Sequence, residues 1–206
     1  MRGKKGLVLI LGGLVLIAAS ALLSAYNVWD ADRAGTVSQA ALKDLDQQIP
    51  VLAELNLPEE LIPDYILNPK MGMPTQEVDG YQYIGRIDIP ALEISLPVMD
   101  SWSYPQLKIA PCRYKGSAYL DNLILAAHNY TRHFGGIHTL VPGDAVVFTD
   151  TDGNIFNYTV ADMEQLEPTD IKEMEAGDWD LTLFTCTVGG QYRVTVRCTR
   201  DETPLL

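Results

Sequence analysis

Three side chains with complementary chemistry stand at the ends of apolar segments. Cys186 ends one such segment and precedes a turn that contains Gly189 and Gly190. His128 follows another apolar run and opens a loop, and Arg193 comes seven residues after Cys186. A thiolate is a nucleophile, an imidazole carries protons, and a guanidinium holds a developing oxyanion. If the three strand ends converge on one rim of a sheet, the combination predicts acyl transfer through a cysteine.

Each of these residues also has a structural interpretation when it is taken alone. A cysteine in an apolar strand is usually an inert core thiol, a histidine after a strand usually belongs to a loop, and a strand arginine is usually solvated. Only the combination favours catalysis. Arg197 is the alternative arginine, since it has the same strand parity as Arg193. The shorter interval from Cys186 favours Arg193.

The elements that must position these side chains are short strands. Apolar or alternating segments separated by turns predict an all-β barrel or sandwich. Asp152 and Gly153 mark a hairpin between two of the segments, and residues 168–178 predict a short helix. The predicted strands are residues 83–89, 94–98, 122–127, 145–148, 155–160, 181–185 and 192–198.

Four strings resemble one known family. "TLFTC" at residues 182–186 resembles the Thr-Leu-x-Thr-Cys signature of the sortases, and an arginine follows it in "YRVTVR" at residues 192–197. "LILAAHN" at residues 123–129 is similar to the sortase strand that ends in the catalytic histidine, and "IGRIDIPALEISLPV" at residues 84–98 is similar to the opening strands. The resemblance covers roughly residues 81–198.

The resemblance implies a closed eight-stranded β-barrel with short helices and a cysteine transpeptidase activity. We expect no cofactor. By it, Cys186 attacks a sorting motif of Leu-Pro-x-Thr-Gly type, His128 serves as general acid and then base, and Arg193 stabilises the oxyanion. Thr185 and Asn129 are expected to support the site. The implied partners are surface proteins or pilins that carry the motif and an amine from a peptidoglycan precursor or a pilin lysine.

The N-terminal segment predicts a membrane anchor. Residues 6–26 carry no charge and would span about 31 Å as a helix, which is roughly the thickness of a bilayer core. Basic residues precede this segment and acidic residues follow it, so the positive-inside rule places the N-terminus in the cytoplasm and the remainder outside the cell. A cleaved signal peptide is the alternative, because Ala19-Ser20-Ala21 fits a cleavage site.

Composition and proline content suggest three parts. Residues 1–26 form the basic tip and transmembrane helix, and residues 81–206 form the catalytic barrel. Residues 27–80 form a juxtamembrane helix and a proline-rich linker. In that helix Val37, Ala40, Ala41 and Leu45 recur at helical spacing. The linker, residues 49–80, is a candidate cover for the substrate groove.

The balance of charges and the candidate metal ligands limit the classes of function that the sequence allows. The chain has 27 acidic and 15 basic residues, which disfavours binding to nucleic acid. The acids of residues 164–175 (Glu164, Glu167, Asp170, Glu173 and Glu175) suggest a calcium site, although a solvated acidic helix is the simpler interpretation.

Further cysteines and histidines lie outside the proposed triad. Cys112 and Cys198 form either a disulfide or two buried thiols. His133 and His138 are predicted to shape the loop after His128, since a spacing of five residues does not align three histidines on one helix face.

Two rival functions remain open from the sequence. One is a cysteine hydrolase on the same barrel, which would release its acyl group to water. The other is a membrane-tethered adhesion or scaffold module without catalysis, in which Cys186 would be dispensable.

Overall fold

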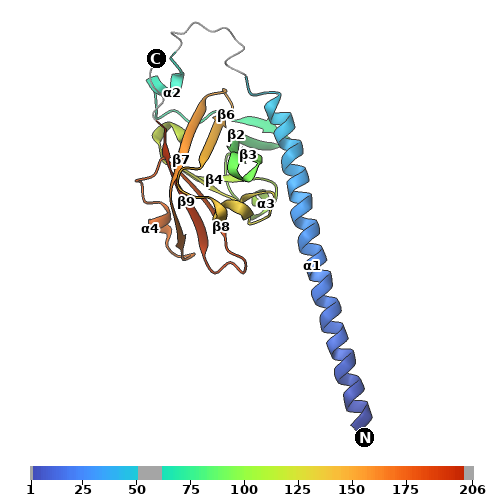
Figure 1. Ribbon diagram of the computed structural model, residues 1–206. Coiled ribbons are helices and arrows are strands. Elements are labelled where there is room, and N and C mark those ends of the chain that lie inside the picture. The colour runs from blue at the N-terminus through green and yellow to red at the C-terminus, as the bar shows by residue number, and fades with distance from the viewer. Residues whose placement is uncertain (1, 51–61, 202–206) are drawn as a thin grey trace. The chain divides into compact units, whose positions relative to one another are not determined.

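A computed structural model describes residues 2–50 and 62–201 of the chain (Figure 1). These divide into two compact units, Met1–Arg33 and Ala34–Leu206. The first unit lies within helix α1 (Arg2–Asp46), which runs without interruption past the predicted end of the membrane span at residue 26. By length and composition this helix could cross a membrane. Its large apolar side chains from Leu7 to Leu23 are exposed, which suits a lipid environment.

The second unit is built mainly of short strands. The strands are β1 (Gln76–Val78), β2 (Tyr81–Ile89), β3 (Ile94–Met99), β4 (Cys112–Lys115), β5 (Leu123–Ala126), β6 (Ala145–Asp150), β7 (Ile155–Leu166), β8 (Leu181–Cys186) and β9 (Arg193–Arg200). Short helices connect them: α2 (Asp64–Leu67), α3 (Tyr104–Leu107), α4 (Ile171–Met174), and the 3-10 turns η2 (Pro90–Leu92), η3 (Ala118–Leu120) and η4 (Phe134–Thr139).

Eight of these strands close into a barrel. The sheet runs in the order β2-β3-β4-β5-β8-β9-β7-β6, and β6 pairs back to β2. Among the described strands, β1 pairs with β2 alone and stays outside the closed ring. The β3–β4 and β5–β8 pairs are parallel and the others are antiparallel. The expected closed eight-stranded barrel is therefore confirmed.

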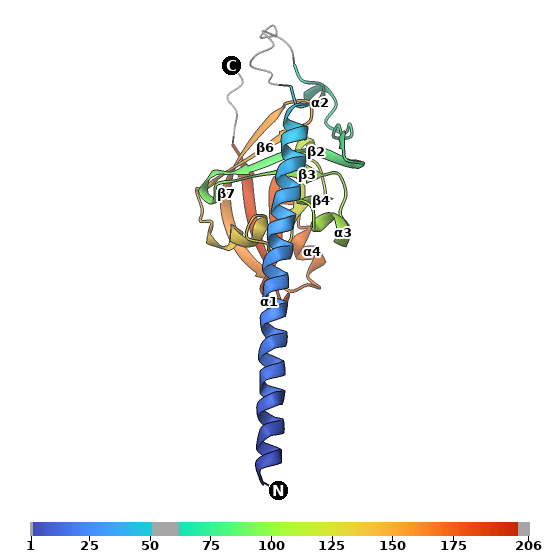
Figure 2. The ribbon, with the colours of Figure 1, turned by 90° about the vertical axis from the view of Figure 1, so that its right-hand side faces the viewer.

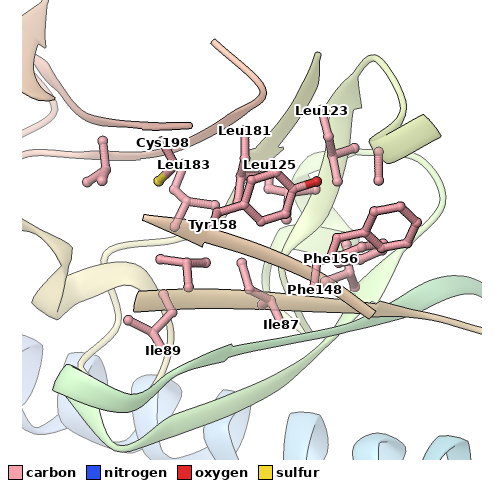
Figure 3. Packing of buried hydrophobic residues seen from close by; sticks show 14 of the residues in the cluster. Ile87, Ile89, Leu123, Leu125, Phe148, Phe156, Tyr158, Leu181, Leu183 and Cys198 are labelled. Atoms are coloured by element: carbon pink, nitrogen blue, oxygen red, sulfur yellow. The ribbon is translucent and has the colours of Figure 1, made fainter. Parts of the chain in front are cut away.

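Apolar side chains from every side of the ring fill the barrel interior. Ile87, Leu125, Phe148, Phe156 and Leu183 are fully buried there (Figure 3). Strand β5 is buried along its whole length, as its continuous apolar sequence predicts. Burial of side chains of this size is the main source of the stability of such a core.

The remainder of α1, from Ala34 to Asp46, packs on the barrel within the second unit. Ala34, Ser38, Ala41 and Leu45 are buried there, at helical spacing. Gln39 donates a hydrogen bond to the carbonyl of Ser95 at 2.9 Å, and Asp46 pairs with Arg86 at 3.2 Å, so this segment lies along β2 and β3 (Figure 2).

The structure also shows where the sequence prediction of elements was wrong. All seven predicted strands form, but β1 and β4 were missed because they are too short to show alternation. The juxtamembrane helix forms as predicted; of the residues that recur at helical spacing, Ala41 and Leu45 are buried, and Val37 and Ala40 are exposed. Strand β1 falls inside the predicted linker, and residues 51–61 of that linker lie outside the described residues.

Candidate active site

His128, Cys186 and Arg193 come from three neighbouring strands and share the outer face of the sheet. On β8, Leu181 and Leu183 point into the barrel core, so Cys186 belongs to the opposite face. The same alternation applies to His128, since Leu123, Leu125 and Ala127 are core residues, and to Arg193, since Val194, Val196 and Cys198 are core residues. The three side chains therefore meet on the outside of the wall formed by β5, β8 and β9.

Hydrogen bonds between β5 and β8 bring His128 and Cys186 together. The backbone N–H of Ala127 donates to the carbonyl of Phe184 at 3.2 Å. The Thr185 hydroxyl donates to the carbonyl of Ala127 at 2.8 Å, although the two residues are 58 positions apart in sequence. This buried contact ties the residue before Cys186 to the residue before His128. Thr185 thus holds together the backbone at the ends of β5 and β8.

The β8–β9 hairpin fixes Arg193 beside Cys186, because the two residues are direct partners in the antiparallel register. The turn between them is closed by hydrogen bonds from the Thr187 N–H to the Tyr192 carbonyl at 2.9 Å and from the Gly190 N–H to the Thr187 carbonyl at 2.8 Å. Gly189 and Gly190 have φ of 89° and 75°, which side chains other than glycine rarely adopt.

The three residues line a cavity of about 320 Å³ on this outer face. One wall is aromatic, with Trp102, Tyr104 and Tyr114 in contact with Phe184 through a chain of ring pairs with centroids 5.3–5.9 Å apart. The segment around α4 also lines the cavity, with Glu167, Pro168, Asp170, Ile171 and Met174. The cavity is thus mostly apolar, and Cys186, His128 and Arg193 are among the residues that line it.

No pattern in the sequence predicted the aromatic wall. Trp102 and Tyr104 lie in a connecting segment without periodicity, and Tyr114 lies on the missed strand β4. Asn129, which was expected to support the site, is exposed and does not line the cavity.

Arg197 has a different environment from Arg193, although both lie on the outer face of β9. It is 1% exposed, and its Nε pairs with Glu164 at 2.8 Å. Its terminal nitrogens donate to the carbonyls of Glu173 and Met174 at 2.6 and 3.1 Å and to the Thr182 hydroxyl at 2.9 Å. Arg197 therefore holds α4 against the barrel, whereas Arg193 faces the cavity.

Two other cysteines are buried and free. Cys112 and Cys198 form no disulfide, and the sulfur of Cys198 lies among the core side chains (Figure 3). Burial raises the pKa of each thiol to about 12, so neither is a ready nucleophile. Cys186 is partly exposed in the cavity.

Three of the five acids considered for calcium have other partners. Glu164 pairs with Arg197 and Glu175 with Lys115, and the Asp170 carboxylate accepts a hydrogen bond from the Glu167 N–H at 2.9 Å. Across residues 2–50 and 62–201, no group of three or more histidine, cysteine or acidic side chains is arranged to hold a metal ion.

Comparison with known proteins identifies the fold and the family. The model of the Sortase domain matches residues 87–201. Sortase A of Bacillus anthracis is 30% identical over 115 residues, which are 53% of this chain and 54% of that protein, so the match spans about half the length of this curated relative.

Solved structures of sortases are similar to this chain. Sortase C1 of Streptococcus suis has a TM-score of 0.52 and 26% identity, over 59% of this chain and 74% of that one. The sortase D5 transpeptidase of Clostridium perfringens has a TM-score of 0.58 and 20% identity, over 81% of this chain and 99% of that one, and shows the common fold. Because the family model covers more than half of the chain, this protein belongs to the sortase family.

Proposed function

We propose that this protein is a membrane-anchored cysteine transpeptidase that cleaves a C-terminal sorting motif and transfers the upstream acyl group to an amine. The observation that carries the proposal is that Cys186, His128 and Arg193 line one cavity. The relatives support it, since one solved sortase is described as a transpeptidase. The substrates proposed are surface proteins or pilins with a motif of Leu-Pro-x-Thr-Gly type.

The proposed reaction has two acyl transfers. The Cys186 thiolate attacks the scissile carbonyl carbon, Arg193 donates hydrogen bonds to the oxyanion, and the C–N bond breaks as protonated His128 gives its proton to the leaving amine. An acceptor amine from a peptidoglycan precursor or a pilin lysine then attacks the thioester. His128 takes the proton of that amine, and Cys186 leaves as the thiolate.

The apolar walls of the cavity favour transfer over hydrolysis, because they leave little polar surface to hold a water beside the thioester. Thr185 contributes by fixing the two strand ends. The mechanism needs no metal, and addition of calcium is expected to leave the rate unchanged within about twofold, because Glu164 and Glu175 are engaged in ion pairs.

A peptide-library assay tests the proposal. Peptides with sorting motifs are incubated with and without an amine acceptor, and the products and the Cys186 adduct are followed by mass spectrometry. We expect a thioacyl adduct on Cys186 and an acceptor-dependent transfer product. Cleavage that is independent of the acceptor would instead favour the hydrolase. Unchanged biological activity of Cys186→Ala would favour the scaffold module.

The proposed topology places the catalytic barrel outside the cell. It rests on the basic residues before the apolar part of α1 and the acidic residues after it. A membrane-impermeant maleimide applied to intact cells should label Cys186, and it should fail to do so if the orientation is reversed.

A further inference from the structure

We infer that the barrel-bound part of α1 holds the loop that carries His128, and that Gly35 and His133 are positioning residues of the active site. This inference rests on the proposed catalytic role of His128. It concerns residues 34–46 of α1 and the loop of residues 128–134, both within the second unit.

The first contact is between Gly35 and Arg132. Both Ala34 and Gly35 are buried against the barrel. A Cβ at Gly35 would lie 2.5 Å from Cδ, 2.6 Å from Nε and 2.9 Å from Cβ of Arg132. The Arg132 side chain therefore lies directly over the backbone of α1, and only glycine leaves room for it.

The second contact is made by His133. This side chain is 0% exposed and interacts with the backbone of Ala34 on α1, although neither ring nitrogen makes a hydrogen bond of normal geometry with any residue that the structure describes. Burial lowers the pKa of His133 to about 4, and the charges of His128 and Arg132 act in the same direction. The ring is therefore neutral at physiological pH and packs as an apolar group between the helix and the loop.

Ring contacts continue from His133 to the active site. The ring of Tyr130 lies 5.5 Å from that of His133 and 4.9 Å from that of His128, between centroids. The loop is also closed by its backbone, since the carbonyl of Tyr130 accepts from the N–H groups of His133 and Gly135, and the carbonyl of His128 accepts from Phe134. A displacement at α1 would thus reach the imidazole through a few packed side chains.

The inference predicts a specific loss of catalysis when the helix is pushed away. Gly35→Leu adds a good helix former, so helix propensity does not fall, but its side chain displaces Arg132. The matched control is Ala40→Leu on the exposed side of the same helix. In the full-length protein in detergent, we expect Gly35→Leu to lower kcat about tenfold with KM unchanged within about twofold. Ala40→Leu should match the parent.

A second measurement is independent of the sorting motif. The rate of Cys186 alkylation against pH reports the interaction of the thiolate with protonated His128. If the loop is displaced, the midpoint of this profile should rise by about half a pH unit or more in Gly35→Leu. A parent protein that cleaves no sorting peptide would refute the proposed function, while a shifted midpoint would still support the positioning role.

If Gly35→Leu does not fold, a double-mutant cycle with the smaller substitution Gly35→Ala tests the inference. Arg132→Ala removes two of the three atoms that a Cβ at residue 35 would meet. The loss caused by Gly35→Ala should therefore be smaller in the Arg132→Ala background than in the parent. Additive effects, or a kcat and an alkylation profile equal to those of the parent in both Gly35 variants, would overturn the inference.

Discussion

The cavity and the buried parts of the barrel unit hold the same three residue types in different environments. Cys186, Arg193 and His128 line the cavity. Cys198, Arg197 and His133 are buried, with exposed fractions of 0%, 1% and 0%. The buried residues make stabilising contacts or are harder to ionise, whereas the residues that line the cavity are accessible to a substrate. Residue type alone therefore does not define the site. The local environment distinguishes the proposed catalytic residues from the structural ones.

The cysteine pair should show the largest difference in activity. Cys186→Ala removes the proposed nucleophile and should lower transfer of a sorting peptide at least about thousandfold. Cys198→Ala should keep the rate within about threefold and lower the free energy of unfolding by about 1 kcal/mol, since it removes one buried atom group. Peptide transfer and denaturant unfolding measure the two effects, and a large rate loss in Cys198→Ala would break the comparison.

The thiols should also differ in reactivity in the folded protein. Iodoacetamide near pH 7.5 should modify Cys186 at least about a hundredfold faster than Cys112 or Cys198, because Cys186 is partly exposed and burial raises the pKa of the other two thiols to about 12. Peptide mapping after timed quenching gives the three rates. Equal rates in the folded protein, together with faster labelling of all three in denaturant, would argue against a distinct environment for Cys186.

The arginine pair separates catalysis from support. Arg193→Gln should lower kcat about a hundredfold with little effect on stability, because the proposed donor to the oxyanion is lost. Arg197→Gln should lower the free energy of unfolding by about 3 kcal/mol, because buried carbonyls lose their donor and Glu164 loses its partner. Steady-state kinetics and urea unfolding of both variants test this. The reverse pattern would exchange the roles of the two residues.

The buried histidine should make stability depend on pH. The pKa of His133 is about 4 in the folded protein and 6.5 in the unfolded chain, so the unfolded chain binds more protons between these values. The stability contributed by neutral His133 is present above pH 6.5 and decreases as the pH falls toward 4, by about 2 kcal/mol between pH 7 and pH 5.

Urea unfolding at several pH values measures this dependence. His133→Phe should flatten it, whereas His138→Gln at an exposed position should leave it as in the parent. A slope that persists in His133→Phe would assign the dependence to other groups.

Local sequence determined the long apolar helix and most of the strands, because alternation and continuous apolar runs are patterns of neighbouring residues. The order of His128, Cys186 and Arg193 along the chain also indicated the chemistry. Tertiary structure decided which face they share, since that depends on the pairing of β5 with β8 and of β8 with β9. It also decided that Arg193 faces the cavity while Arg197 is enclosed by α4. Such contacts join residues far apart in sequence, and no local pattern encodes them.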